Sequence, residues 1–137
     1  IFQNPNLLDH LNALDNVAFT LTLSGIKIDE ARDKAKLALT DIGLGDRLDF
    51  YPHQLSGGQN QRVSIARAIS GKRALLLADE PTGNLDTASG QSIMNLFQRL
   101  CHDHINPLSI LMVTHDPIMA SKADRIFLLK EGQVVPN

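Results

Sequence analysis

The sequence predicts a single α/β domain in which helices cover a parallel β-sheet. Two short apolar runs, 74–79 and 109–114, lack polar alternation, which is typical of strands buried on both faces of a parallel sheet. Apolar residues recur at three- and four-residue steps over 29–42, 59–70 and 87–103, which predicts helices there. The chain has 137 residues, an ordinary length for one domain.

Polar residues mark the ends of several predicted elements. Asp86 or Thr87 suits the N-cap of the last helix, because a short side chain with an oxygen atom can accept a hydrogen bond from a free backbone N–H there. Near the end of the chain, Glu131-Gly132 joins 125–130 to 133–135, and this pattern predicts a β-hairpin.

Composition and charge exclude several classes of function. The chain has 13 Lys and Arg against 15 Asp and Glu, a formal net charge of −2, so we expect no nucleic-acid partner and no polybasic face for anionic lipids. Its apolar runs are far shorter than the about 20 residues needed to cross a bilayer. Cys101 is the only cysteine, so no internal disulfide can form, which suits a reducing compartment.

Two adjacent carboxylates, Asp79-Glu80, lie at the carboxyl end of the first predicted strand. Adjacent side chains on an extended segment point in different directions, so the two can do different work. Asp79 can help to hold Mg²⁺, which prefers oxygen ligands, and Glu80 can orient or deprotonate a water for attack on phosphorus. The alternative interpretation is a strand that simply ends in solvated acids.

A second motif, Ser56-Gly57-Gly58-Gln59, runs directly into the helix predicted over 59–70. Glycines let the backbone approach a ligand closely, and the free N–H groups of a helix N-terminus attract anions. Taken alone, the motif can equally be an ordinary loop and helix cap.

Three further positions are candidates for chemistry. His115 follows the second predicted strand, so it lies at the same edge of a parallel sheet as the acid pair and could touch a terminal phosphate. Gln3 could reach a metal-bound water, and Asp86 ends a polar turn. Each has a plainer interpretation: a solvated histidine, an ordinary surface amide and a helix start.

In their order along the chain, these motifs resemble those of the ATP-binding-cassette (ABC) ATPases over essentially all 137 residues. Leu55-Ser56-Gly57-Gly58-Gln59 reproduces the LSGGQ signature letter for letter, and 75–81 resembles the Walker B strand with its catalytic Glu. Phe2-Gln3 is similar to the Q-loop, Asn84-Leu85-Asp86 to the D-loop and His115 to the switch histidine. The residues at 2–8, 14–17 and 78–86 are most similar in sequence to those of the lipoprotein-releasing and macrolide-export subfamily.

The resemblance implies an incomplete P-loop NTPase-like fold. We expect one partial ABC ATPase domain over 1–137, with a mainly helical arm at about 9–50 and the signature helix, Walker B, D-loop, switch histidine and C-terminal hairpin over 51–137. The P-loop motif G-x-x-x-x-G-K-[ST] is absent from the sequence, which begins at Ile1-Phe2 without Met. We therefore expect the later part of a longer protein, or an assembly in which another chain fills the gap. Without the P-loop, we expect an incomplete sheet and no normal ATP binding.

For the full-length protein, the resemblance implies the ATP-hydrolysing subunit of a membrane ABC transporter at the cytoplasmic face, serving export or lipoprotein release. The implied partners are transmembrane permease subunits and, in a head-to-tail dimer, either a second copy of the protein or a second ABC ATPase domain. The implied cofactors are ATP and Mg²⁺. The implied catalytic residues are Glu80, His115 and Gln3; the nucleotide-binding residues are Ser56, Gly57, Gly58, Gln59 and Asp86; the metal ligands are Asp79 and Gln3.

Two other functions share these motifs. One is a soluble ABC-type ATPase of DNA repair, chromosome maintenance or translation, which the near-neutral charge and the short arm disfavour. The other is a non-catalytic, truncated cassette that acts only as an assembly partner, which the intact Glu80 and signature disfavour.

Overall fold

The computed structural model of the chain describes residues 1–71, 73–103 and 108–136. The helical elements, in chain order, are α1 (Ala13–Leu23), α2 (Ile28–Asp41), the 3-10 turn η1 (Pro52–Gln54), α3 (Gly57–Ile69), α4 (Thr87–Cys101) and α5 (Pro117–Ala120). The strands are β1 (Leu75–Asp79), β2 (Ser109–Val113), β3 (Phe127–Lys130) and β4 (Gln133–Pro136).

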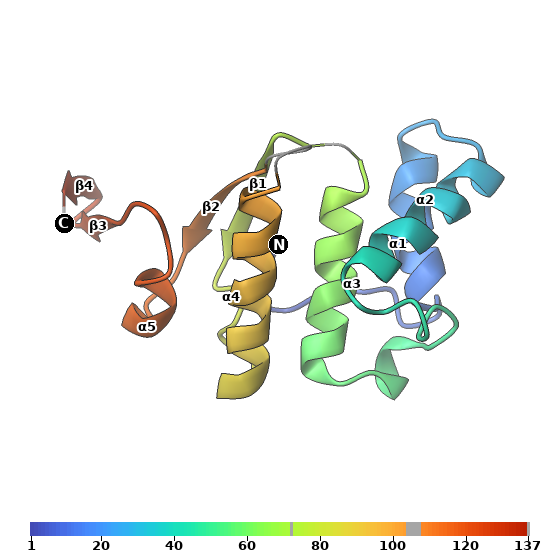
Figure 1. Cartoon of the computed structure of the whole chain (residues 1–137), viewed down its shortest axis with the longest axis horizontal. Helices are drawn as coiled ribbons and strands as arrows, with labels where there is room; N and C mark the ends of the chain where they lie inside the picture. Colours follow the sequence, from blue (N-terminus) through green and yellow to red (C-terminus); the bar gives the residue numbers. More distant parts are fainter. Residues whose placement is uncertain (72, 104–107, 137) are drawn as a thin grey trace.

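Helix α3 lies at the centre of the molecule (Figure 1). It contacts α1 and α2 on one side and α4 on the other, while α4 in turn contacts β2. Val63, Ile65 and Ala66 of α3 are fully buried in the apolar core, which extends from α1 to β1 and α4. The signature region is therefore the start of the helix that lies between α1 and α2 on one side and α4 on the other.

Strands β1 and β2 pair in parallel with Leu75 opposite Ser109 and Asp79 opposite Val113. The other edge of β1 is taken by the first residue: the Ile1 amino group donates to the Leu77 carbonyl (2.6 Å) and the Asp79 N–H donates to the Ile1 carbonyl (2.9 Å). Since the two strands run in the same direction, their carboxyl ends lie at one edge of the sheet.

The prediction that these strands are buried on both faces is wrong for the described chain. Leu76 and Ala78 are buried, but Leu75, Leu77, Leu111 and Val113 on the other face are each more than half exposed. Helix α4 packs on the buried side, and no element among residues 1–71, 73–103 and 108–136 covers the other. The exposed apolar face agrees with the expectation of an incomplete sheet.

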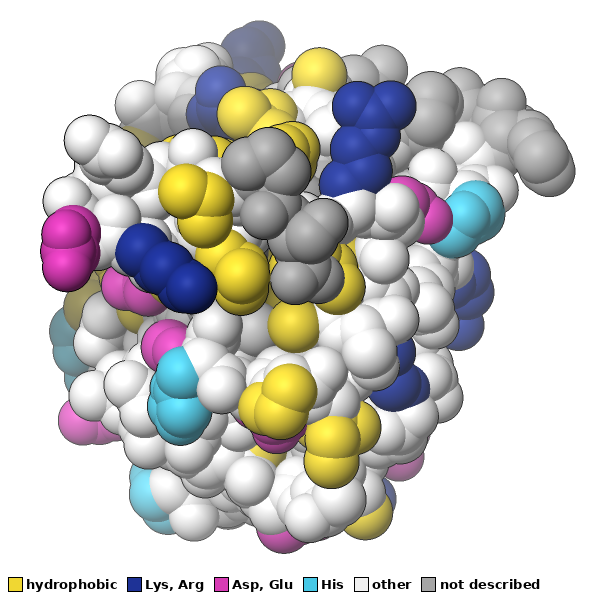
Figure 2. Space-filling model, turned by 90° about the vertical axis from the view of Figure 1, so that its left-hand side faces the viewer, with side chains coloured by type: hydrophobic (Ala, Val, Ile, Leu, Met, Phe, Trp, Pro, Cys, Tyr) yellow, Lys and Arg dark blue, Asp and Glu magenta, His cyan; other side chains and the backbone are white. Residues whose placement is uncertain are grey.

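The predicted helices and the parallel strand pair are confirmed, with ends that differ by only a few residues. Asp86, rather than Thr87, is the N-cap of α4, and its side chain accepts a hydrogen bond from the Ser89 N–H. The hairpin of β3 and β4 is also confirmed; Glu131 (φ 48°) and Gly132 (φ 78°) both adopt the left-handed conformation that tight two-residue turns require. The hairpin lies at one end of the molecule, where exposed hydrophobic side chains gather (Figure 2).

Candidate nucleotide-hydrolysis site

The carboxyl ends of β1 and β2 bring Glu80 and His115 into direct contact. Nδ1 of His115 lies 2.7 Å from Oε1 of Glu80, and the His115 backbone N–H donates to the same oxygen at 2.8 Å. The Thr114 hydroxyl donates to Oε2 of Glu80 at 3.1 Å. Both carboxylate oxygens of Glu80 are thus held by the end of β2, as the parallel arrangement of the two runs predicts.

Glu80 has an unusual backbone conformation, with φ at 45°. A non-glycine residue in the left-handed region costs about 1–3 kcal/mol unless its surroundings hold it there. Here the Glu80 N–H donates to the Val113 carbonyl (2.9 Å), and the Glu80 carbonyl accepts from the Gly83 N–H (3.0 Å). The turn directs the carboxylate back over the end of β2, which is the geometry that the contact with His115 needs.

The contact between Glu80 and His115 stabilises the charged form of each side chain. Partial burial acts to raise the pKa of Glu80, but hydrogen bonds from the His115 side chain, the Thr114 hydroxyl and the His115 N–H outweigh it and hold the pKa below its ordinary value. The hydrogen bond and the negative charge of Glu80 raise the pKa of His115. Glu80 therefore stays ionised at neutral pH, and His115, whose side chain is 84% exposed, presents its ring to solvent.

The signature motif forms a helix cap. Ser56 is the N-cap of α3, where its hydroxyl accepts from the Gln59 N–H (3.3 Å), and the Gln59 side chain accepts in return from the Ser56 N–H (2.9 Å). This reciprocal capping box fixes the start of the 13-residue helix. Ser56 and Gly57 are exposed, so the N-terminus of α3 opens to solvent, as an anion site requires.

Gly58 has a packing role that sequence reasoning missed. A Cβ atom at this position would lie 3.0 Å from Oγ and 3.1 Å from Cβ of Ser89 in α4, whereas one at Gly57 would meet only Leu85 at 3.4 Å. Gly58 therefore allows the first turns of α3 and α4 to approach closely. The same turn of α4 is capped by Asp86, whose hydrogen bonds from Ser89 lower its pKa.

The side chain of Gln3 lies against the turn that follows Glu80. Its amide Nε2 donates to Asn84 Oδ1 (2.9 Å), and the Asn84 amide donates to Asn4 Oδ1 (2.8 Å). The segment that resembles the Q-loop is thus joined to the one that resembles the D-loop. Across the parts of the chain that the structure describes, no hydrogen bond or ion pair joins Ser56 to the Glu80–His115 pair, so these form two separate groups.

A metal held by protein side chains alone does not fit this region. No cluster of three or more His, Cys, Asp or Glu able to hold a metal occurs in 1–71, 73–103 or 108–136. Mg²⁺ that binds together with a nucleotide needs only one or two carboxylates, because phosphate oxygens and water complete its shell. The exposed Asp79 at the end of β1 has the chemistry of such a ligand.

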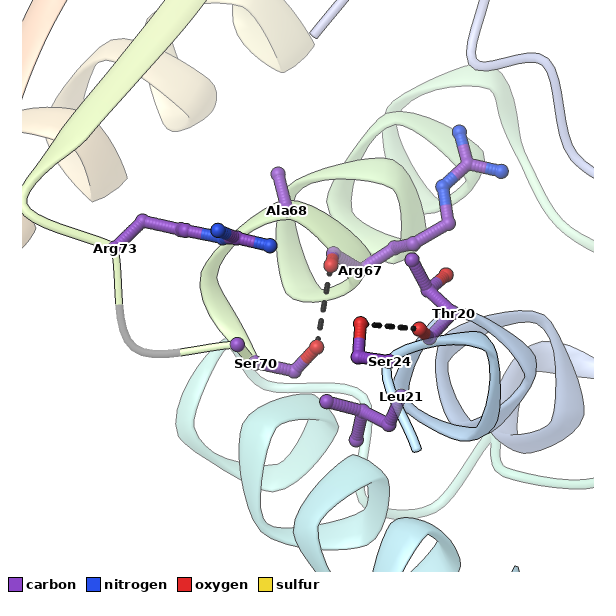
Figure 3. Close-up of a pocket in the computed structure, with 8 residues that line it drawn as sticks. Thr20, Leu21, Ser24, Arg67, Ala68, Ser70 and Arg73 are labelled. Atoms are coloured by element: carbon purple, nitrogen blue, oxygen red, sulfur yellow. Dashed lines mark hydrogen bonds between the residues drawn. The ribbon is translucent and has the colours of Figure 1, made fainter. Parts of the chain in front are cut away.

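Two small cavities lie away from these residues. One, of about 170 Å³, lies at the C-terminal ends of α1 and α3 and is lined by residues that include Thr20, Ser24 and Ser70 (Figure 3). The other, of about 220 Å³, lies where Arg62 and Arg99 donate to the carbonyls that end α2. No predicted site residue lines either cavity.

The sequence profile described as "ABC transporter" matches residues 1–83, more than half of the chain. The chain belongs to the ABC transporter family.

Its relatives include the macrolide export ATP-binding/permease protein MacB of Hahella chejuensis (44% identical), Syntrophobacter fumaroxidans (45%) and Shewanella oneidensis (47%). The matches cover the whole chain but only about a fifth of each relative. These matches agree with the similarity to macrolide-export proteins that the sequence shows.

Solved structures confirm the fold. The ATP-binding cassette MJ0796, in a dimeric post-hydrolysis state bound to ADP and Pi, matches with a TM-score of 0.78 and 37% identity over 97% of this chain and 59% of that one. A second dimeric structure of MJ0796 matches equally well at 38% identity. The chain has part of the P-loop ABC ATPase fold.

None of the helices among its described residues is long and apolar enough to cross a membrane.

The Glu80–His115 contact makes a testable prediction about the titration of His115. The contact favours the charged ring of His115. Its contribution to the stability of the fold is therefore fully present below the ordinary histidine pKa and is lost as the pH rises through the raised pKa of His115. An NMR titration of the chain should give a pKa for His115 above that of an ordinary histidine, and Glu80→Gln should lower it. Glu30→Gln, which removes only a surface ion pair with Lys34 in α2, should leave the pKa of His115 unchanged. An identical His115 pKa in Glu80→Gln and the wild type would contradict the contact.

Proposed function

We propose that the chain is the later part of an ATP-hydrolysing cassette that drives an export or lipoprotein-releasing ABC transporter. The observation that carries the proposal is the contact between Glu80 and His115 at the shared edge of β1 and β2. It pairs an ionised carboxylate with an exposed histidine at the place where α/β folds bind ligands. Membership of the ABC transporter family points to ATP as the substrate of hydrolysis. The similarity to MacB proteins favours a membrane transporter over a soluble ATPase.

In this proposal, each group has one task. Glu80 orients and deprotonates the attacking water, since its lowered pKa keeps it available as a base. His115, whose pKa is raised, steadies the γ-phosphate from the end of β2. Asp79 binds Mg²⁺, directly or through water, and Gln3 reaches the metal and its water from the segment that resembles the Q-loop. When bound, Mg²⁺ offsets the negative charge of the phosphates.

We further propose that Ser56, Gly57, Gly58 and Gln59 close on the ATP held by a second cassette. The exposed N-terminus of α3 supports this, because its free N–H groups and helix dipole suit a γ-phosphate. The dimeric MJ0796 structures support it by similarity. Asp86, which caps α4 beside Gly58, would sense the opposite subunit. Loss of the γ-phosphate would then weaken the closed state.

The proposed activity belongs to the full-length protein. The 137 residues contain no P-loop motif, and the outer face of the β1–β2 pair is apolar and exposed. We therefore expect residues 1–137 alone neither to bind ATP in the family's manner nor to hydrolyse it, as a truncated, non-catalytic cassette would behave.

The proposed partners are transmembrane permease segments at the cytoplasmic face of the membrane. Three large apolar side chains are exposed at the end of α1 and the start of α2: Phe19 (45%), Leu23 (72%) and Ile28 (54%). They lie in the arm that the family resemblance assigns to the permease, and they are suited to an apolar partner. Recovery of the protein with ribosomes or nucleic acid rather than membranes would instead favour the soluble ATPase.

Glu80→Gln tests the catalytic assignment. The amide keeps the size of the side chain but cannot accept a proton, so ATP hydrolysis by the full-length protein should fall by about 10²–10⁴-fold. ATP binding, measured by equilibrium titration, should remain. Glu30→Gln is again the matched control, because Glu30 only pairs with Lys34 on the surface of α2. Turnover at the wild-type rate in Glu80→Gln would exclude Glu80 as the base.

Ser56→Arg tests closure across two copies. In the wild-type protein, hydrogen exchange of the amides of Gly57 to Gln59 should slow when ATP is added, because the N-terminus of α3 becomes covered. The bulk and charge of arginine should prevent this, while Ser24→Arg at the exposed end of α1 should leave it intact. If ATP still protects these amides in Ser56→Arg, the signature segment does not close over nucleotide.

A further inference from the structure

Gln61 is a fully buried polar residue at the point where three functional segments meet. It lies in α3, five residues after Ser56, and is only 1% exposed. Its amide Nε2 donates to the Phe2 carbonyl at 3.0 Å and to the Pro81 carbonyl at 2.8 Å. One side chain thus joins the signature helix to backbone 59 residues before it and 20 residues after it.

The orientation of the Gln61 amide follows from its partners. Both are carbonyl oxygens, which can only accept, so the NH₂ group must face them and uses both of its hydrogens. The amide oxygen Oε1 is buried and has no hydrogen-bond partner among the described residues. A buried acceptor without a partner is unfavourable, and the two hydrogen bonds that the NH₂ group donates to the Phe2 and Pro81 carbonyls offset that cost.

The two carbonyls lie next to the candidate catalytic residues. Phe2 immediately precedes Gln3, and Pro81 immediately follows Glu80. Arg67, later in the same helix, donates to the carbonyls of Pro5 (2.7 Å) and Asn6 (2.8 Å). Helix α3 therefore holds the first segment at two points, but only Gln61 also reaches the turn that carries Glu80.

We propose that Gln61 is a positioning residue that sets Gln3 and Glu80 relative to each other and to the start of α3. The inference rests on the proposed ATPase function. Because the segments carrying Gln3 and Glu80 meet at one amide, a movement of α3 on closure over nucleotide shifts both. Gln61 itself touches no reacting atom and acts through the backbone at Phe2 and Pro81.

The test is Gln61→Met in the full-length protein, assayed for ATP hydrolysis. Methionine has a similar length but no donor, so it removes both hydrogen bonds with little change of volume. A misplacement of about 1 Å can cost about 10²-fold in rate, so kcat should fall at least about tenfold, while KM for ATP should change less than about threefold. Gln98→Met is the matched control, since it removes one exposed amide-to-carbonyl bond, to Lys122, far from the site. It should leave kcat unchanged.

The outcomes separate this inference from the proposed function. If the wild-type protein hydrolyses ATP and Glu80→Gln does not, the ATPase assignment stands; Gln61→Met with wild-type kcat then overturns the positioning role alone. A rise in KM with kcat unchanged also overturns it. Should Gln61→Met not fold, Gln61→Asn replaces it, because its amide is one methylene too short to hold both carbonyls. If neither variant folds, Gln61 serves the fold rather than the site, and if the wild type hydrolyses no ATP, the inference fails with the proposed function.

Discussion

The parallel register of β1 and β2 is the constraint on which the site depends. Asp79 lies opposite Val113, and the Glu80 N–H continues the pairing to the Val113 carbonyl before the chain turns away. Side chains alternate between the faces of a strand, so a slip of one residue would send Glu80 away from the end of β2. With this register, the left-handed turn at Glu80 is enough to place its carboxylate against the backbone and ring of His115.

Helix α3 links this strand edge to the rest of the molecule. Its N-terminus is fixed by the Ser56–Gln59 capping box. In its middle, Gln61 donates hydrogen bonds to two backbone segments, and in its last turn Arg67 donates to the Pro5 carbonyl. Gly58 lets α4 approach its first turn. Residues at the start, middle and later part of the sequence are thus placed by one rigid element, and a change at its exposed tip has a physical route to the turn after Glu80.

Local periodicity made much of the fold predictable. The three helices and the two strands of the parallel pair follow from apolar spacing, and the meeting of Glu80 with His115 follows from parallel strands ending at one edge. Burial of both strand faces was wrongly predicted, because an apolar run looks the same in sequence whether or not this chain covers it. The hydrogen bonds of Gln61 to two distant segments were missed, since a glutamine in a helix carries no sign of carbonyls 59 and 20 residues away. The left-handed conformation of Glu80 was also missed, since its hydrogen bonds rather than a glycine hold it.

A double-mutant cycle on ATP hydrolysis by the full-length protein tests most directly whether Glu80 and His115 act as one unit. The rates of Glu80→Gln, His115→Ala and the double variant are compared with that of the wild type. Groups that work through a single contact are strongly non-additive, so the double variant should be no slower than the slower single variant. If instead the two losses multiply, the residues act independently, and the contact at the edge of β1 and β2 is not the basis of the activity.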